Sequence, residues 1–278
     1  MLSLILAVNF QVLFVLMMKW GKAHRVDMDG ANLINYAVGA IVALATLFGG
    51  IPALTSSDWG VIGVLGTVNG IVFVSTLLIL QWSIPKNGAA LTATFFRLGV
   101  LVPVVLSVVL FSEIPTLLQG LGVLAAVAAI LLFGGGSGGA SMDFRVLLVV
   151  FLGGGAVDLM AKLFTRFGPE VGNSLYLAVT FVVGTILSLG LFLRAKGRLD
   201  GRALAVGAVM GVANLLCTLM ILRAAAVLPS YVIFPGYSVL VILEVSLVEL
   251  FTGELKLTPR RLLGWAAIAL AIVLLGQS

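Results

Sequence analysis

The chain has 278 residues, of which 61% are hydrophobic and 10% are charged, and its formal net charge is +5. An ordinary soluble domain has about 25% charged residues, so this chain has too few to cover a water-facing surface. The mean hydropathy of +1.23 indicates the same. The composition comes close to excluding a soluble globular enzyme and a disordered chain, and it predicts an all-α polytopic membrane protein.

Ten stretches are apolar for long enough to cross a bilayer as helices, which takes about 20 residues each. Their apolar runs are continuous rather than alternating, which favours helices over strands. In chain order the predicted spans are 2–20, 30–48, 59–80, 88–111, 115–133, 145–165, 173–193, 203–224, 228–251 and 260–276.

The chain repeats itself after five spans. The segment FSEIPTLLQGLGVLAAVAAILLFG, which starts at Phe111, is similar to FTGELKLTPRRLLGWAAIALAIVLLG, which starts at Phe251. Weaker matches keep separations of 140 to 145 residues, and a glycine-rich stretch from Gly134 to Gly139 lies between the halves. We therefore predict two five-helix repeats, 1–135 and 136–278, within one membrane domain. Because five is odd, the second repeat is inverted relative to the first, a plan common among secondary transporters.

Lysine and arginine counts predict the orientation. If the loops alternate between sides, one side holds 12 of these residues and the other holds 2. The positive-inside rule makes the basic loops cytoplasmic and places both termini outward.

With its two helix-end signatures at Glu113 and Glu254, each followed by a glycine and an apolar fifth helix, the chain resembles the ten-helix drug/metabolite transporter superfamily, in its EamA-like branch. The resemblance covers essentially the whole chain and implies transport of a small metabolite, often with proton coupling. Many members keep both termini in the cytoplasm, whereas the charge count here places them outward.

Charges inside spans are costly, so each is a candidate functional residue. Arg97 and Glu244 lie at similar depth in the fourth and ninth spans, either as a fixed interhelical ion pair or lining a substrate cavity. Asp158 and Lys162 share a helical face, as a self-neutralising pair or with Asp158 receiving a cationic substrate or a proton. Glu244 and Asp158 are the candidate proton carriers.

Uncharged polar residues near the midplane are further candidates for substrate binding. Asn69 and Asn214 each lie about eleven residues into a span, and either residue can bond a neighbouring helix or a substrate. Tyr36 and Tyr176 form a second matched pair, and Tyr237 shares a helical face with Glu244. Tyrosine supplies an apolar ring and one hydroxyl group, which suits a cavity for small organic molecules.

Prolines inside spans indicate places where a helix could bend. Pro103 lies in the fourth span, and Pro235 and Gly236 lie in the ninth. Proline removes a backbone hydrogen bond, so these residues are either hinges or sites of static curvature. Glu113 and Glu254 lie at helix ends, where we expect structural capping.

The leading functional hypothesis is a secondary transporter that moves a small polar metabolite, amino-acid or amine-like, across a bacterial-type inner membrane by alternating access with proton coupling. The alternative is a flippase for lipid-linked carriers. With one histidine and one cysteine, in different regions of the chain, we expect no enzyme activity, metal site or cofactor. The expected partners are the substrate, the lipid bilayer and protons, with no nucleic acid, and the chain is expected to be a monomer or homodimer.

Overall fold

The computed structural model describes residues 1–50, 52–134, 143–253 and 257–277, and these residues form helices without any β-strand. The all-α class is therefore confirmed. The α-helices are α1 (Leu2–Ala23), α2 (Met28–Ala45), α3 (Ser56–Asn87), α4 (Ala89–Leu98), α5 (Leu101–Phe111), α6 (Leu117–Gly134), α7 (Phe144–Phe167), α8 (Asn173–Ala195), α9 (Gly201–Ala225), α10 (Ser230–Phe251) and α11 (Pro259–Leu275), and a short 3₁₀ helix, η1 (Glu170–Gly172), precedes α8.

Nine helical segments of the described chain are long and apolar enough to cross a membrane, with Ala89–Phe111 counted as one segment. The tenth predicted span corresponds to α11, whose 17 residues lie at the short end of what a bilayer accepts. The membrane-spanning helical architecture is therefore confirmed. Glu254 and the glycine-rich stretch beyond Gly134 lie outside the described residues.

Polar side chains cap the N-termini of several helices. Asp27 accepts hydrogen bonds from the backbone N–H groups of Asp29 and Gly30 at the start of α2. Asp200 accepts one from Ala203 in α9, and Thr258 accepts one from Arg261 in α11. Each side chain satisfies an N–H group that has no partner within its own helix, so these loops end abruptly in a helix.

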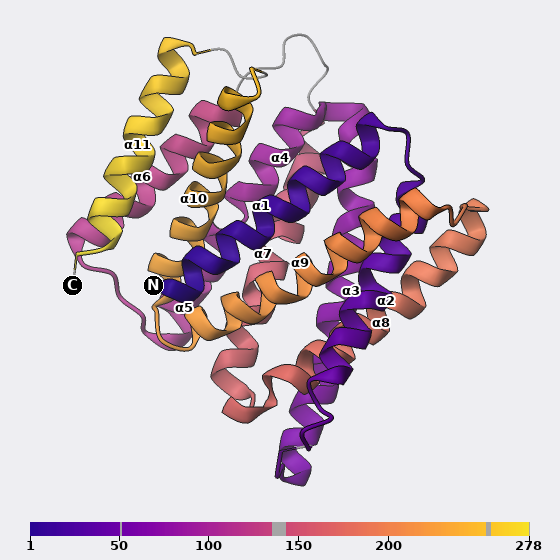
Figure 1. The fold of residues 1–278 in the computed structure, drawn as a ribbon. Helices are drawn as coiled ribbons and strands as arrows, with labels where there is room; N and C mark the ends of the chain where they lie inside the picture. Colours follow the sequence, from indigo (N-terminus) through magenta and orange to yellow (C-terminus); the bar gives the residue numbers. More distant parts are fainter. Residues whose placement is uncertain (51, 135–142, 254–256, 278) are drawn as a thin grey trace. The chain divides into compact units, whose positions relative to one another are not determined.

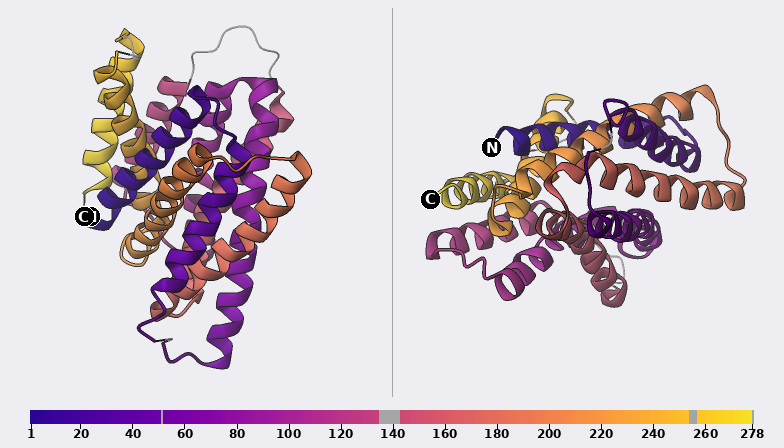
Figure 2. Two further views of the ribbon diagram at one scale, coloured as in Figure 1. Left: turned by 45° about the vertical axis from the view of Figure 1, so that its right-hand side comes forward. Right: turned by 90° about the horizontal axis from the view of Figure 1, so that it is seen from below.

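The longest helix is α3, with 32 residues, whereas the sequence predicts a span over 59–80. At 1.5 Å per residue its length is about 48 Å, which exceeds the hydrocarbon core of about 30 Å. The left view of Figure 2 shows α3 along its length. Its last residue, Asn87, accepts a hydrogen bond from the N–H of Asp143 at 2.8 Å, so the end of α3 is tied to the residue before α7.

The chain forms two compact units. Unit 1 comprises Met1–Val74 and Leu163–Ala226, and unit 2 comprises Ser75–Lys162 and Val227–Ser278. Each unit thus combines segments from both sides of the predicted repeat boundary after residue 135. A division into compact units does not test a division into sequence repeats, so the repeat boundary after residue 135 stays a prediction.

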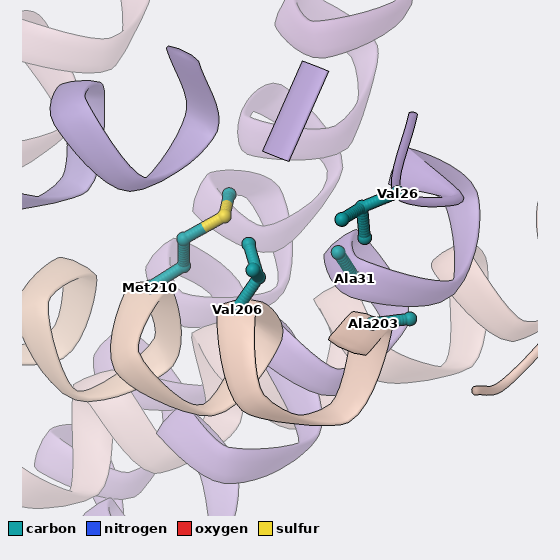
Figure 3. Packing of buried hydrophobic residues seen from close by; sticks show 5 residues of the cluster. All are labelled: Val26, Ala31, Ala203, Val206 and Met210. Carbon is teal, nitrogen blue, oxygen red and sulfur yellow. The ribbon is translucent and has the colours of Figure 1, made fainter. Parts of the chain in front are cut away.

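Within unit 1, α9 packs along α1, and α2 packs against both α8 and α9 (Figure 1). Figure 3 shows Val26 and Ala31 facing Ala203, Val206 and Met210 of α9, and all five are buried. Alanines at this contact let α2 and α9 approach closely, as small residues do between membrane helices.

Within unit 2, α6 and α11 lie side by side, and α10 packs against α5, α6 and α11 (Figure 1). Their shared core is again rich in small side chains, comprising Ala126, Ala129, Val239, Ile268 and Ala271.

Candidate functional site

The predicted fourth span is divided into α4 and α5 by a tight turn in unit 2. Gly99 (φ −51°, ψ −24°) and Val100 (φ −50°, ψ −25°) have dihedral angles typical of a 3₁₀ turn. Pro103 has no N–H to bond the carbonyl of Gly99, four residues earlier, and a proline ring clashes with that carbonyl. Instead the N–H of Val102 bonds the Gly99 carbonyl at 2.8 Å. The interruption of the helix that Pro103 predicts therefore lies one turn before the proline, at Gly99 and Val100.

The second predicted hinge behaves differently. Pro235 and Gly236 lie inside α10, which runs as one helix from Ser230 to Phe251. Pro235 is the sixth residue of α10, where it removes one backbone hydrogen bond, yet the helix continues past it. Whether Pro103 or the Pro235–Gly236 pair serves as a hinge stays a prediction.

Glycines bring α7 into backbone contact with this tight turn. A Cβ atom at Gly154 would overlap the carbonyl of Phe96, and one at Gly99 would lie 2.5 Å from the carbonyl oxygen of Phe151. The approach is possible because these positions have no side chain. Asp158 follows Gly154 by four residues and so lies one turn farther along the same face of α7.

Arg97, the penultimate residue of α4, lies within electrostatic reach of Asp158. Its guanidinium carbon lies 6.0 Å from the centroid of the Tyr237 ring of α10, at the outer limit of a cation–π contact. In the described part of the chain, neither Arg97 nor Asp158 forms a hydrogen bond or an ion pair closer than 4.0 Å. Both are half-buried. Three helices thus bring a cation, an anion and an aromatic ring together.

Glu244 lies on α10, seven residues after Tyr237, and is half-buried. The sequence left open an ion pair between Glu244 and Arg97. Across the described ranges Glu244 forms no such pair, and Arg97 instead interacts with Tyr237 and Asp158.

A second polar cluster of unit 2 is centred on Glu113, between α5 and α6. One carboxylate oxygen forms an ion pair with Lys162 of α7, and the other accepts a hydrogen bond from the N–H of Ser230 at 2.8 Å. The hydroxyl of Ser107 also donates to that of Ser230 at 2.7 Å. Glu113 therefore caps α10 rather than the helix that follows it, and Lys162 pairs with Glu113 rather than with Asp158.

The electrostatic balance at Glu113 favours its ionised form. Partial burial raises the pKa of this carboxyl group. The hydrogen bonds from Lys162 and Ser230 and the positive charge of Lys162 lower it by a larger amount, so the net pKa lies below the usual value of 4.5. The cluster is thus a charged network of the folded protein.

The remaining predicted site residues lie in unit 1. Asn69 donates to the hydroxyl of Thr180 at 3.3 Å, and Asn214 donates to the side-chain oxygen of Asn35 at 3.3 Å. Both asparagines thus bond a neighbouring helix, one of the two predicted alternatives. Tyr176 is fully buried and stacks on Phe164, with 3.9 Å between ring centroids.

Two buried polar atoms of this group have no hydrogen-bond partner in the described structure, the Oδ1 atom of Asn69 and the hydroxyl of Tyr176. Unpaired buried polar atoms are uncommon and cost free energy. They leave hydrogen-bonding capacity available beside Thr180.

Glycines give unit 1 a reciprocal packing pattern. Cβ atoms at Gly66 and Gly70 of α3 would meet the carbonyl oxygens of Tyr176 and Thr180 in α8, at 3.2 and 2.7 Å. Cβ atoms at Gly207 and Gly211 of α9 would likewise meet those of Ala31 and Asn35 in α2, at 2.5 and 2.6 Å. The third helix of each predicted repeat thus packs on the second helix of the other.

The contact between α2 and α8 has the same reciprocity. The ring of Phe181 fills the space at Gly39, and the ring of Tyr36 fills the space at Gly184. The two glycines are 145 residues apart, as are the two rings. By packing, Tyr36 corresponds to Phe181, five residues beyond the Tyr176 that matches it by residue type.

The predicted site residues therefore fall into two groups. Unit 1 holds Tyr36, Asn69, Tyr176 and Asn214, and unit 2 holds Arg97, Pro103, Asp158, Pro235, Gly236, Tyr237 and Glu244. Ser107, Thr180 and Ser230 were missed by sequence reasoning. The sequence offers only a weak indication of them, since each is a small hydroxyl residue within or beside an apolar run.

Comparison with known proteins gives the fold alone. No family model matches the chain, and no curated protein matches it. A solved structure described as "Crystal structure of protein" is similar to it with a TM-score of 0.77 and 13% sequence identity, covering 98% of this chain and 94% of the other.

Proposed function

We propose that this chain is a secondary transporter that moves a small polar metabolite, amino-acid or amine-like, across the membrane by alternating access coupled to protons. The observation that carries the proposal is the grouping of Arg97, Asp158 and Tyr237 in unit 2, without a direct ion pair in the described structure. Ionisable residues within membrane spans are rare and typically mark substrate or ion pathways.

The chemistry of the three residues suits a ligand that carries both charges. The guanidinium of Arg97 can bind a carboxylate through two parallel hydrogen bonds, and the carboxylate of Asp158 can bind an ammonium group. The Tyr237 ring offers an apolar surface beside them. A zwitterionic metabolite would therefore neutralise both protein charges, whereas either charge without a partner is costly in an apolar environment.

The backbone beside these residues supports the same proposal. Arg97 directly precedes the tight turn at Gly99 and Val100. Transporters commonly place substrate sites where a membrane helix is interrupted, since the interruption frees backbone groups and allows movement. Proton coupling would use Asp158 and Glu244, which carry carboxyl groups within the spans of unit 2.

The reciprocal packing of unit 1 supports the predicted duplication. Two inverted five-helix repeats, 1–135 and 136–278, would exchange equivalent helices, so α3 would pack on α8 as α9 packs on α2. The glycine contacts follow this pattern. We further propose the predicted orientation, with basic loops cytoplasmic.

The test is thermal stabilisation of the purified protein by a panel of amino acids, amines, nucleosides, sugars and polyprenyl lipids at two pH values. We expect a zwitterionic or amine compound to raise the unfolding temperature, and Arg97→Ala and Asp158→Asn to abolish that shift. The compound should then exchange across the membrane of proteoliposomes that contain the protein. A shift with the polyprenyl lipids alone would reject the metabolite transporter in favour of a lipid-linked carrier flippase.

A further inference from the structure

The ion-paired cluster around Glu113 is linked to the candidate site through two helices. On α7, Lys162 follows Asp158 by four residues, so both lie on one face, one turn apart. On α10, Tyr237 follows Ser230 by seven residues, so these two also share a face, two turns apart. Glu113 contacts Lys162 and Ser230 at the same time.

We propose that Glu113 is a positioning residue of the candidate site: it sets the register of α7 against α10 and thereby the placement of Asp158 and Tyr237 around Arg97. The proposal concerns the same site as the proposed function, and its consequence for transport rests on that function. Its structural content, the register of two helices within unit 2, can be measured without any substrate.

The contacts of Glu113 are strong enough to determine this register. The side chain of Lys162 is 8% exposed and that of Glu113 is 21% exposed. Lys162 is the buried partner of this pair, and moving it away from Glu113 would leave its charge uncompensated, so sliding α7 away from Glu113 costs free energy. The N–H of Ser230, at the start of α10, has no acceptor within its own helix, and Glu113 supplies one.

Neighbouring contacts keep Glu113 itself in place. Ser107 accepts a hydrogen bond from the N–H of Glu113 through its carbonyl at 3.2 Å and donates one through its hydroxyl to Ser230. The intervening Ser112 has left-handed backbone dihedrals (φ 55°, ψ 31°) that end α5. The carboxylate therefore projects from a defined turn rather than from a long loop.

The two residues that Glu113 contacts lie near two of the three places where the chain passes from one unit to the other. Those points lie after Val74, after Lys162 and after Ala226. Lys162 is the last residue before one of them, and Ser230 follows another by four residues. A change at Glu113 therefore acts close to two of the places where the chain leaves or enters unit 2.

The experiment measures the distance between α7 and α10 by double electron–electron resonance. Nitroxide labels are attached at Leu152→Cys and Leu247→Cys, two exposed positions of unit 2, in a Cys217→Ser background. The test variant is Glu113→Gln, which can still accept the Ser230 hydrogen bond but cannot form the ion pair. The matched control is Glu170→Gln, because Glu170 is an exposed glutamate of unit 1.

We expect Glu113→Gln to broaden the distance distribution and to shift its mean by about 1–2 Å, the size of helix shifts at packed interfaces. Glu170→Gln should leave the distribution unchanged. Lys162→Gln should reproduce the effect from the other partner, and it replaces Glu113→Gln if that variant does not fold. If the variants lower the unfolding temperature while the distribution, measured well below that temperature, stays as in the parent, Glu113 stabilises without positioning and the proposal is overturned.

The same variants separate this proposal from the proposed function. A shifted distribution in a protein that binds no compound of the panel would support the positioning role and reject the transporter. An unchanged distribution in a protein that transports a metabolite would reject the positioning role and support the transporter.

Discussion

The guanidinium of Arg97 lies over the ring of Tyr237, with 6.0 Å between its central carbon and the ring centroid. Contacts of this type are worth about 0.5–2 kcal/mol, more when water is excluded. The contact orients a cation that has no hydrogen-bond acceptor in the described part of the chain. It therefore keeps the donors of Arg97 available for a ligand.

The first prediction concerns this ring. Tyr237→Ala should weaken binding of the stabilising compound about two- to tenfold, because it removes a contact of about 0.5–1.4 kcal/mol that orients Arg97. Tyr237→Phe keeps the ring and should stay close to the parent protein. The affinities are measured by titrating the thermal shift. Equal losses in both variants would attribute the effect to the hydroxyl rather than to the ring.

The second prediction concerns proton coupling. If Glu244 carries the proton, Glu244→Gln should reduce uptake driven by a pH gradient at least about tenfold, since an amide cannot be protonated and deprotonated at physiological pH. Exchange of substrate at equal concentrations should remain largely intact. Both modes are measured in the same proteoliposomes, and the same pair of assays applied to Asp158→Asn shows which carboxylate is coupled. A variant that loses both modes to the same extent would place Glu244 in binding or folding instead.

The third prediction concerns the tight turn in the fourth span. Pro103→Ala restores an N–H that can bond the Gly99 carbonyl, so α4 and α5 should join into one continuous helix. Backbone amides near residues 99–103 should exchange their hydrogens about tenfold more slowly by mass spectrometry. Pro235→Ala is the control, because α10 is already continuous at that residue. Unchanged exchange in Pro103→Ala would assign the turn to the glycine contacts with α7.

The fourth prediction uses two glycines of α3. A Cβ at Gly70 would lie 2.7 Å from the carbonyl oxygen of Thr180, whereas one at Gly63 meets nothing within 4 Å. Gly70→Ala should therefore destabilise the protein by about 1–3 kcal/mol. Gly63→Ala should be neutral or stabilise it by up to about 1 kcal/mol through helix propensity. A fluorogenic thiol reagent can follow unfolding, because Cys217 is buried and is the sole cysteine.

The fifth prediction is a pH dependence. The folded-state pKa of Glu113 is held below 4.5 by Lys162 and Ser230 despite its burial. Its ionised form therefore contributes stability above pH 4.5, and this contribution declines as the pH falls through the folded-state value. The free energy of unfolding of the parent should exceed that of Glu113→Gln by about 1.5–3 kcal/mol near neutral pH, the range for hydrogen bonds to charged groups. The difference should shrink in acid, and a difference that grew in acid would contradict the depressed pKa.

The membrane-spanning helices could be predicted from the sequence because lipid imposes a simple rule. Every backbone group in the hydrocarbon core needs an internal partner, so continuous apolar runs become helices. The turn at Gly99 was partly visible, since Pro103 was recognised as a kink. Its location was not, because the steric conflict falls on the residue four positions earlier.

The partners of charged residues were harder to predict. Spacing alone placed Lys162 with Asp158, four residues away on the same helix, yet Lys162 pairs with Glu113, 49 residues away. Glu113 was expected to cap a helix, but it caps α10, which begins 117 residues later. Such choices depend on which helix ends meet in three dimensions, and the spacing of residues along the chain does not show this.

The interleaved composition of the two units has a consequence for biosynthesis. Helix α2 is complete at Ala45, but both of its main packing partners lie beyond Asn173. At 5–20 residues per second, ribosomes need roughly 6 s or more to make the intervening chain. During that time the buried polar residues Asn32 and Asn35 lack the neighbours that will cover them, so the first helices must enter the membrane before the packing that stabilises them exists.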